Sequence, residues 1–525
     1  MIKTVQCDVL VVGGGMAAMM VAVEAAGKGA NTVLVDKGTL MESGSSPQSL
    51  YGLAATIAPE DSPELLFKDI VADGYGLSEQ NLAWEAAQGA AENYRFLENI
   101  GMRFMRGSDG KPYLYHGVGH SVRRGVTQDR RGQGAHPVAV VGAEARRRGA
   151  KLYDSIMITK ILGSKDGVTG AVGVSRDGVF HLFEAKTVVI AAGGANNLYP
   201  NACENIRDPE YWTTGDAFAL AFDLGVPLVD MEFSNFREGK ALYASRIGGF
   251  LVNAQGERFM SKYDSRLERA PRGKLVEAMY IETRQGRGPI YHQHPDPIRK
   301  EAIEQDYTTA DMAGKRVLCE IDYQRLLGGI LINERAETSM KGLFAAGESQ
   351  GGFHGADRMQ GASFLECTIF GGRTGRNAAE YASKTEVEFN PIQAKEEIDR
   401  LREIQDRKGG SDPSRVLEVV RDTMWEHCSI VKEARGLKKA LETITELREN
   451  NPLSGNLFAA LTGANLALTA EMCIRASLVR EETRGTHRRG DFPKQDDAIW
   501  LKHVAIENRN GKVVTTTLPI TRVKK

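Results

Sequence analysis

Three consecutive glycines near the start of the chain, at 13–15, have the spacing of a phosphate-binding turn. They follow an apolar, mostly β-branched stretch at 8–12 and precede a run of small residues at 16–27. A strand, a glycine turn and a helix in this order present N–H groups and the positive end of the helix dipole to phosphates. Asp36 follows a second apolar stretch, where its carboxylate can accept a hydrogen bond from a ribose hydroxyl. The pattern predicts a βαβ unit that binds a dinucleotide.

The small residues of this turn each have a steric role. Gly13 permits the tight turn, Gly15 lets the backbone approach a pyrophosphate, and Ala18 keeps helix and strand close. The unit stands at the start of the chain, and two later buried strands, at 187–190 and 343–346, also run into small residues. Flavoproteins with two dinucleotide-binding folds return such strands to the same sheet, so these features favour FAD as the dinucleotide.

Composition and charge narrow the class of protein. A chain of 525 residues is long enough for two or three domains, and its 42% apolar and 26% charged residues are ordinary for a globular protein. The net charge of −1 implies no nucleic-acid partner. Six cysteines, none at C-x-x-C spacing, predict no metal site in this chain and fit a reducing cytoplasm. No apolar run reaches the roughly 20 residues of a membrane span, so none is expected.

The order of elements predicts an α/β fold in three parts. A Rossmann-like FAD-binding domain at 1–235 and 328–389 is interrupted by an α+β capping domain at 236–327 and followed by a C-terminal helical domain at 390–525 with a strand-like tail. Helices are expected within 62–104, 136–149, 215–225, 394–405, 412–428, 433–449 and 456–477, the last four as a three- or four-helix bundle. Strands are expected at 151–162 and 503–523, and hairpins at 170–183 and 248–259.

Four motifs resemble those of the flavoprotein subunits of succinate dehydrogenase and fumarate reductase, with L-aspartate oxidase as a sister branch. The stretch H-G-A-D-R-M at 354–359 is similar to the family's H-G-A-N-R-L, and S-F-L-E-C at 363–367 to its S-L-L-E-C. Residues 270–272 resemble the cap segment of the catalytic arginine, and residues 484–500 resemble the family's R-G-A-H and D-D-x-x-W elements. The resemblance implies bound FAD and redox chemistry on a small acid.

The resemblance implies a proton-transfer role for Arg272. This arginine would pass a proton to one alkene carbon while flavin N5 passes a hydride to the other. Because an unperturbed arginine has a pKa above about 12, it needs a desolvated site and a relay. Arg237, Glu238 and Arg246 are the candidates for that relay. The alternative is that Arg272 only binds an anion.

The resemblance likewise implies that Arg358 clamps a substrate carboxylate, since its planar fork suits bidentate binding. The alternative is a structural pair with Glu366 or Asp357. Glu348 would bind a ribityl hydroxyl, and Asp216 the adenosine end. The cofactor contacts expected from the patterns and the resemblance are Gly13, Gly14, Gly15, Met16, Ala17, Ala18, Asp36, Lys37, Ser43, Gly44, Gly193, Gly194, Asp216, Glu348, Ser363 and Phe364.

Two histidines of the family's active site and its flavin-attachment histidine do not carry over. Ser234 and Gln324 stand where the dicarboxylate members have histidine, and with His354 they are expected to line the substrate site. Neither Ser234 nor Gln324 can carry positive charge, which predicts weak activity on fumarate and succinate and a substrate with one acidic group and a larger neutral remainder. The attachment histidine falls at Ser45, and no histidine occurs in residues 1–100, so the FAD is expected to be noncovalent.

The leading hypothesis is a reductase or dehydrogenase that acts on a C–C bond next to a carboxylate or carbonyl and exchanges electrons with a separate iron–sulfur subunit. It would be cytoplasmic, or peripheral on the inner face of the membrane through a partner. The alternatives are a stand-alone oxidase similar to L-aspartate oxidase, sulfur chemistry similar to adenylylsulfate reductase, against which the Arg272 segment argues, and a non-enzymatic FAD-binding scaffold. His292 and His294, two apart on a cap strand, line the substrate entrance or have a structural role.

Overall fold

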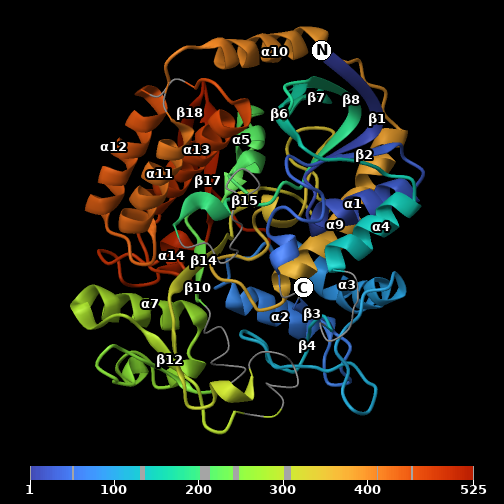
Figure 1. Cartoon of the computed structure of the whole chain (residues 1–525). Helices are drawn as coiled ribbons and strands as arrows, with labels where there is room; N and C mark the ends of the chain where they lie inside the picture. Colours follow the sequence, from blue (N-terminus) through green and yellow to red (C-terminus); the bar gives the residue numbers. More distant parts are fainter. Residues whose placement is uncertain are drawn as a thin grey trace.

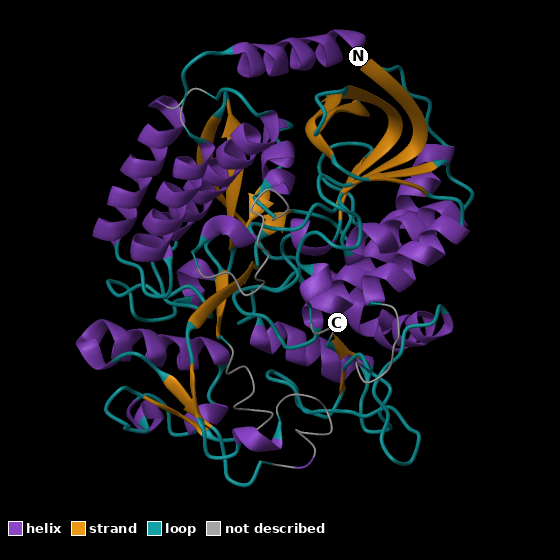
Figure 2. Ribbon diagram, in the orientation of Figure 1, coloured by secondary structure: helices purple, strands orange, loops and turns teal. Residues whose placement is uncertain are grey.

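The computed structural model describes residues 2–49, 52–129, 136–200, 213–239, 248–298, 300, 309–410, 412–450 and 453–523. Arg246, one of the relay candidates, lies outside these residues. An α/β part lies on one side of the molecule, a group of packed helices on the other, and a smaller α+β part below the helices (Figure 1). Figure 2 distinguishes the curved sheet of the α/β part from the helices beside it.

The α/β part is built on a seven-stranded sheet in the order β5-β2-β1-β8-β7-β6, with β16 also paired to β8. The strands are β1 (Ile2–Val12), β2 (Thr32–Val35), β5 (Lys151–Tyr153), β6 (Ile156–Ser164), β7 (Gly167–Ser175), β8 (Phe180–Ile190) and β16 (Leu343–Ala345). β1 runs parallel to both β2 and β8. Its last residues are buried, which explains why they form a continuous apolar run. The predicted βαβ unit is confirmed.

Two strand predictions need correction. The strand expected at 151–162 is broken at Ser155, whose φ of 58° is left-handed, so β5 stays beside β2 while β6 begins a hairpin with β7. The hairpin at 170–183 is present, but its second strand continues without a break through 187–190 as β8. β8 is long because β7 pairs with its first half and β16 with its last residues.

Small residues bring two helices of this part close together. α1 (Met16–Gly27) crosses α9 (Ala362–Ser383), where a Cβ on Gly371 would lie 2.7 Å, and one on Gly375 2.4 Å, from backbone oxygens of α1. Only glycine fits at these two positions. The other helices of this part are α2 (Pro63–Asp73), α3 (Gln80–Asn99), α4 (Pro137–Arg147) and α5 (Asp216–Asp223), within the ranges expected for helices.

The inserted segment has its own hydrophobic cluster. Its main elements are β11 (Phe250–Val252), α7 (Arg272–Glu282), β12 (Tyr291–Gln293) and β13 (Arg316–Leu318), and two antiparallel strands, β10 (Ser234–Glu238) and β14 (Ile321–Leu326), lead into and out of it. The prediction of a hairpin at 248–259 is wrong. β11 pairs with β12 instead, because Phe259 and Met260 are buried in the cluster on a helical turn.

The C-terminal segment contains four long helices and a hairpin. They are α10 (Pro391–Asp406), α11 (Pro413–Cys428), α12 (Ala434–Asn450), α13 (Leu457–Val479), β17 (His503–Arg509) and β18 (Lys512–Leu518). α11, α12 and α13 pack on one another, whereas α10 packs against β6, β7 and the start of α13 (Figure 1), so three of the described helices form the bundle. The hairpin joins β9 (Leu228–Val229) and β15 (Gly329–Ile330) in a four-stranded sheet. The tail is therefore strand-like, as expected.

α13 is the one helix in the described part of the chain that has the length and hydropathy of a membrane span. In the structure, 78% of its most apolar window is buried. Its neighbours are α11, α12 and α5. This burial is typical of a central helix in a globular part.

Candidate active site

A cavity of about 430 Å³ opens where β1, β2, β8 and β16 end. Ligands bind at this carboxyl edge of parallel sheets in α/β folds. Of the residues expected at the site, its wall holds Gly13, Gly14, Gly15, Met16, Ala17, Asp36, Lys37, Ser43, Gly44, Gly193, Asp216, Arg272, Gln324, Glu348, Arg358, Ser363 and Phe364. The wall does not include Ala18, Gly194, Ser234 or His354.

The glycine turn is shaped for a close backbone approach. Gly13 has a φ of 121°, and a Cβ there would lie 2.2 Å from Ala191 O, so only glycine fits. Gly15 precedes α1 and supplies no side-chain cap, while Met16 N donates to Ser46 Oγ at 2.9 Å. A helix N-terminus and a hydroxyl thus stand together on the wall, which suits a pyrophosphate. The sequence patterns did not single out Ser46.

Three charged residues meet at one end of the cavity. Lys37 donates to Asp216 Oδ2, and Asn465 of α13 donates to Asp216 Oδ1 at 2.8 Å. Asp36 Oδ1 accepts a hydrogen bond from Gly38 N at 2.7 Å, and burial raises the pKa of this carboxyl. The helical part of the chain therefore helps to hold the end of the cavity that the resemblance assigns to adenosine.

Glu348 has a buried carboxylate oxygen that fits a cofactor hydroxyl. Its Oε1 is buried without a hydrogen-bond partner in the described residues. The Nε of Arg325 lies 4.0 Å from that oxygen, and burial raises the pKa of Glu348. Because a buried polar atom without a partner is costly, a ligand hydroxyl at this position would be stabilising. The residues of the cavity therefore fit FAD.

Arg272 and Arg358 share one neutral acceptor on the cavity wall. Arg358 Nη2 donates to Gln324 Oε1 at 2.9 Å, and Arg272 Nη1 to the same oxygen at 3.4 Å. Arg272 begins α7 of the cap, and Gln324 lies on β14. Burial, together with repulsion from Arg272 and Arg325, lowers the pKa of Arg358 to about 9. Arg358 is therefore still protonated at neutral pH, and an anion would relieve the repulsion.

Glu366 pairs with Arg325, a residue that the sequence patterns missed. Arg325 Nη2 donates to Glu366 Oε2 at 3.0 Å and its Nη1 to Ser363 Oγ at 2.6 Å. His354 also lies against Glu366, with Nε2 3.1 Å from Oε2, and burial lowers the pKa of this histidine to about 4. His354 is thus neutral and turned to Glu366, off the cavity wall. In the described part of the chain Arg358 makes no ion pair with Glu366.

Ser234 also lies off the wall, where its Oγ is 3.2 Å from Tyr199 Oη. The relay candidates on β10 lie nearer to the site. Glu238 Oε2 is 3.9 Å from Arg272 Nε, and Arg237 Nη2 is 3.9 Å from Asp322 Oδ2. Position 234 therefore faces an aromatic cluster that contains Tyr199 and Phe236, and β10 and β14 shift register just beyond it, between residues 235 and 236.

His292 lies on the cap strand β12 as expected, whereas His294 directly follows the end of that strand, and the two ring centroids are 4.7 Å apart. Both are buried, and His292 Nε2 is 3.0 Å from Gly248 O. Neither belongs to the wall of the cavity. Their position favours the structural role over a place at the substrate entrance.

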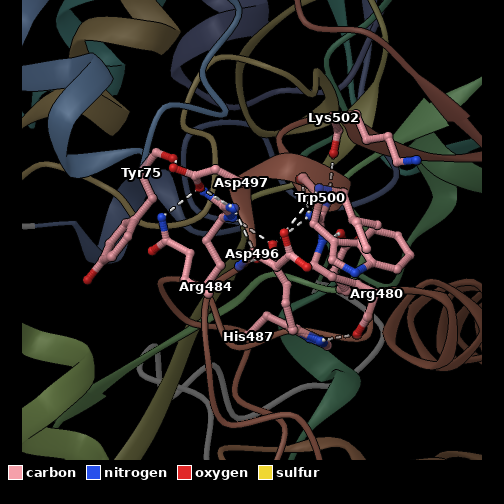
Figure 3. Close-up of polar contacts among 12 residues, drawn as sticks. Tyr75, Arg480, Arg484, His487, Asp496, Asp497, Trp500 and Lys502 are labelled. Carbon is pink, nitrogen blue, oxygen red and sulfur yellow. Dashed lines mark hydrogen bonds and ion pairs between the residues drawn. The ribbon is translucent and has the colours of Figure 1, made fainter.

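The C-terminal motif reaches the site through backbone contacts. Arg484 is buried and donates to Tyr75 O at 3.0 Å and to Asp497 Oδ1 at 2.7 Å (Figure 3). Thr486 N donates to Ala356 O at 2.9 Å. Because Ala356 belongs to the H-G-A-D-R-M stretch, this motif holds the segment that carries Arg358.

The glycine turn, the cavity at the sheet edge and the unpaired oxygen of Glu348 are the features of an FAD-binding site. A family model described as FAD binding domain matches residues 8–364, and one described as fumarate reductase flavoprotein C-term matches residues 418–524. The chain belongs to the fumarate reductase and succinate dehydrogenase flavoprotein family.

Its relatives include reductases and oxidases. One is a subunit of the fumarate reductase (CoM/CoB) of Methanothermobacter marburgensis, which is 31% identical over 96% of this chain and 97% of the relative. The L-aspartate oxidase of Acinetobacter baylyi is 28% identical over 94% of each chain. A structure of E. coli quinol fumarate reductase superimposes with a TM-score of 0.90 at 24% identity, covering 100% of this chain and 98% of that one. The fold agrees with the fold expected from the sequence.

Acid precipitation is expected to release all of the flavin into the supernatant. Ser45, where the attachment histidine would stand, lies on the wall and accepts a hydrogen bond from Asn196 at 2.7 Å. Cys367 is a wall residue too, but burial raises the pKa of its thiol to about 12, so it is a poor nucleophile. Absorbance of the supernatant and the washed pellet measures the release. Flavin that stays in the pellet would show a covalent bond.

Proposed function

We propose that the protein reduces a carbon–carbon double bond next to a carboxylate or carbonyl, or forms one in the reverse direction. Bound FAD would supply hydride chemistry at N5. Arg272 would give or take the proton, and Arg358 would bind the acidic group. The cysteines lack the spacing of a cluster site, and several relatives are named flavoprotein subunits. These two facts support an electron partner in the form of a separate iron–sulfur subunit.

The observation that carries this proposal is the pair of arginines on either side of Gln324. Their exposed fractions are 8% each, so both charges are largely removed from water. Neither Arg272 Nε nor Arg358 Nε has a hydrogen-bond partner in the described residues. The amide oxygen between them is neutral and cancels neither charge. A single carboxylate is the ligand that satisfies two such guanidinium groups.

Turnover with a reduced viologen dye tests the proposal. Monomethyl fumarate and crotonate each offer one carboxylate next to a double bond. Oxidation of the dye that depends on either acid, with the saturated acid as product by NMR, is the expected result. A holoenzyme that is reduced by the dye but passes electrons to no unsaturated acid would contradict the assignment.

A stand-alone oxidase is the second candidate, because the L-aspartate oxidases among the relatives match nearly the whole chain. Admitting air to the reduced holoenzyme separates the two. We expect slow reoxidation with little peroxide, because an electron-transfer flavoprotein receives and passes its electrons through a protein partner. Flavin absorbance and a peroxide assay follow the reaction. Fast reoxidation with one peroxide formed per flavin would favour the oxidase.

A further inference from the structure

Two carboxylates, Asp73 and Asp357, lie near the arginine pair but off the wall of the cavity. Asp73 is the last residue of α2 and is half-buried, whereas Asp357 is buried with an exposed fraction of 7%. A backbone hydrogen bond from Ala356 N to Gly74 O, 3.1 Å long, joins the two segments right beside these residues. The two carboxylates are therefore held on adjacent segments of the chain.

Asp357 lies beside the backbone of both arginines. Its Oδ1 accepts a hydrogen bond from Arg358 N at 2.7 Å. Its Oδ2 lies 3.8 Å from where a Cβ on Gly273 would be, so this oxygen is at the N-terminus of α7, the helix that Arg272 begins. The positive end of the helix dipole and the charge of Arg272 both stabilise a carboxylate in this position.

The C-terminal motif keeps the two segments together. Arg484, buried in the network of Figure 3, donates to Tyr75 O, two residues after Asp73. Thr486 donates to Ala356 O, one residue before Asp357. These buried contacts hold the backbone next to each of the two carboxylates.

The charges around Asp73 and Asp357 favour a state in which one of the two carboxylates keeps its proton. Burial, and next the charge of Asp357, raise the pKa of Asp73 to about 7, with Asp69 acting in the same direction and Arg358 and Arg272 opposing it. Burial also raises the pKa of Asp357, against the opposing effects of its own backbone contact and of Arg272, Arg358 and Arg488. Two carboxylates that share a site do not ionise together.

We propose that Asp73 and Asp357 form a proton reservoir for Arg272, an inference that rests on the proposed function. Reduction of one double bond adds a hydride to one carbon and a proton to the other. The proton leaves Arg272, and the neutral guanidine regains one that the reservoir releases through an intervening water, because neither carboxylate forms an ion pair with Arg272 in the described residues. Half-buried Asp73 then takes a proton from solvent water. The reservoir lies on different segments from Glu238, so it is a route separate from the β10 relay candidates.

Infrared titration of the substrate-free holoenzyme tests the reservoir without turnover. The wild type is expected to show the carbonyl band of a protonated carboxylic acid that disappears as the pH rises through about 7. Asp73→Asn should remove this band. Asp357→Asn, which installs the residue of the family's motif, should shift its loss to lower pH, because the like charge that raises the pKa of Asp73 is gone. A wild type without the band overturns the proposal.

Kinetics with monomethyl fumarate and a reduced dye provide the second readout. The wild-type kcat should fall above a pH of about 7, and Asp73→Asn should lower kcat about tenfold or more with little change in KM, because Asp73 does not touch substrate. Asp223→Asn is the matched control, since Asp223 pairs with Lys160 on the surface. If Asp73→Asn keeps the wild-type pH profile while Glu238→Gln loses it, the reservoir is refuted and the proposed function stands. Absence of turnover in the wild type refutes both.

Discussion

Replacing Arg272 with alanine is expected to lower kcat/KM by at least about 10³-fold while the protein keeps its FAD. The change removes the proton donor, a contribution of roughly 10²–10⁴-fold, and one of the two cations that bind the substrate carboxylate, about 1.5–3 kcal/mol. Arg272 lies on the cap, and its side chain donates a hydrogen bond to Gln324. Cofactor binding depends on other elements, so the flavin content should not change.

Steady-state assays with monomethyl fumarate and a reduced dye measure this effect, and the flavin spectrum reports cofactor content. Arg269→Ala is the matched control, because Arg269 is an exposed arginine three positions earlier in the same segment. It should behave as the wild type. An Arg272→Ala protein with activity within tenfold of wild type would show that Arg272 does not transfer the proton.

Fumarate is expected to be a much poorer substrate than its monomethyl ester. The resemblance implies that two histidines and an arginine bind both carboxylates in the dicarboxylate members, and here Gln324 is neutral while Ser234 lies off the cavity wall. The loss of two charge-assisted bonds costs about 1.5–3 kcal/mol each, or roughly two to four decades in specificity.

The ratio of kcat/KM for the two substrates decides this prediction, because they share the same double bond and differ by one charge. A fumarate kcat/KM near ~10⁶ M⁻¹s⁻¹, well inside the usual enzyme range, would show that the substitutions do not matter. The result bears on the relationship to the Methanothermobacter fumarate reductase, whose matching chain is 31% identical to this one. A fast reaction with fumarate would mean that the two proteins share a substrate as well as a family.

The sequence by itself determined the nucleotide-binding unit and the order of the parts. Gly13 is required because a side chain there would strike the backbone of Ala191, and this requirement shows in a short local pattern. Apolar periodicity likewise located the long C-terminal helices. The predictions of one strand at 151–162 and of a hairpin at 248–259 were wrong. The left-handed backbone of Ser155 breaks the strand, and Phe259 is buried in the hydrophobic cluster of the inserted segment instead of pairing in a hairpin.

Only the tertiary structure decided which side chains share the cavity. His354 and Ser234 stand in motifs of the site but turn away from the wall, while Arg325, which no pattern marked, lies on it. The contact of Arg484 with Tyr75 spans 409 residues of chain. Side-chain direction depends on strand register and on packing between such distant segments. Motif and spacing therefore determined the cofactor and the fold, and long-range packing determined the electrostatics of the arginine pair.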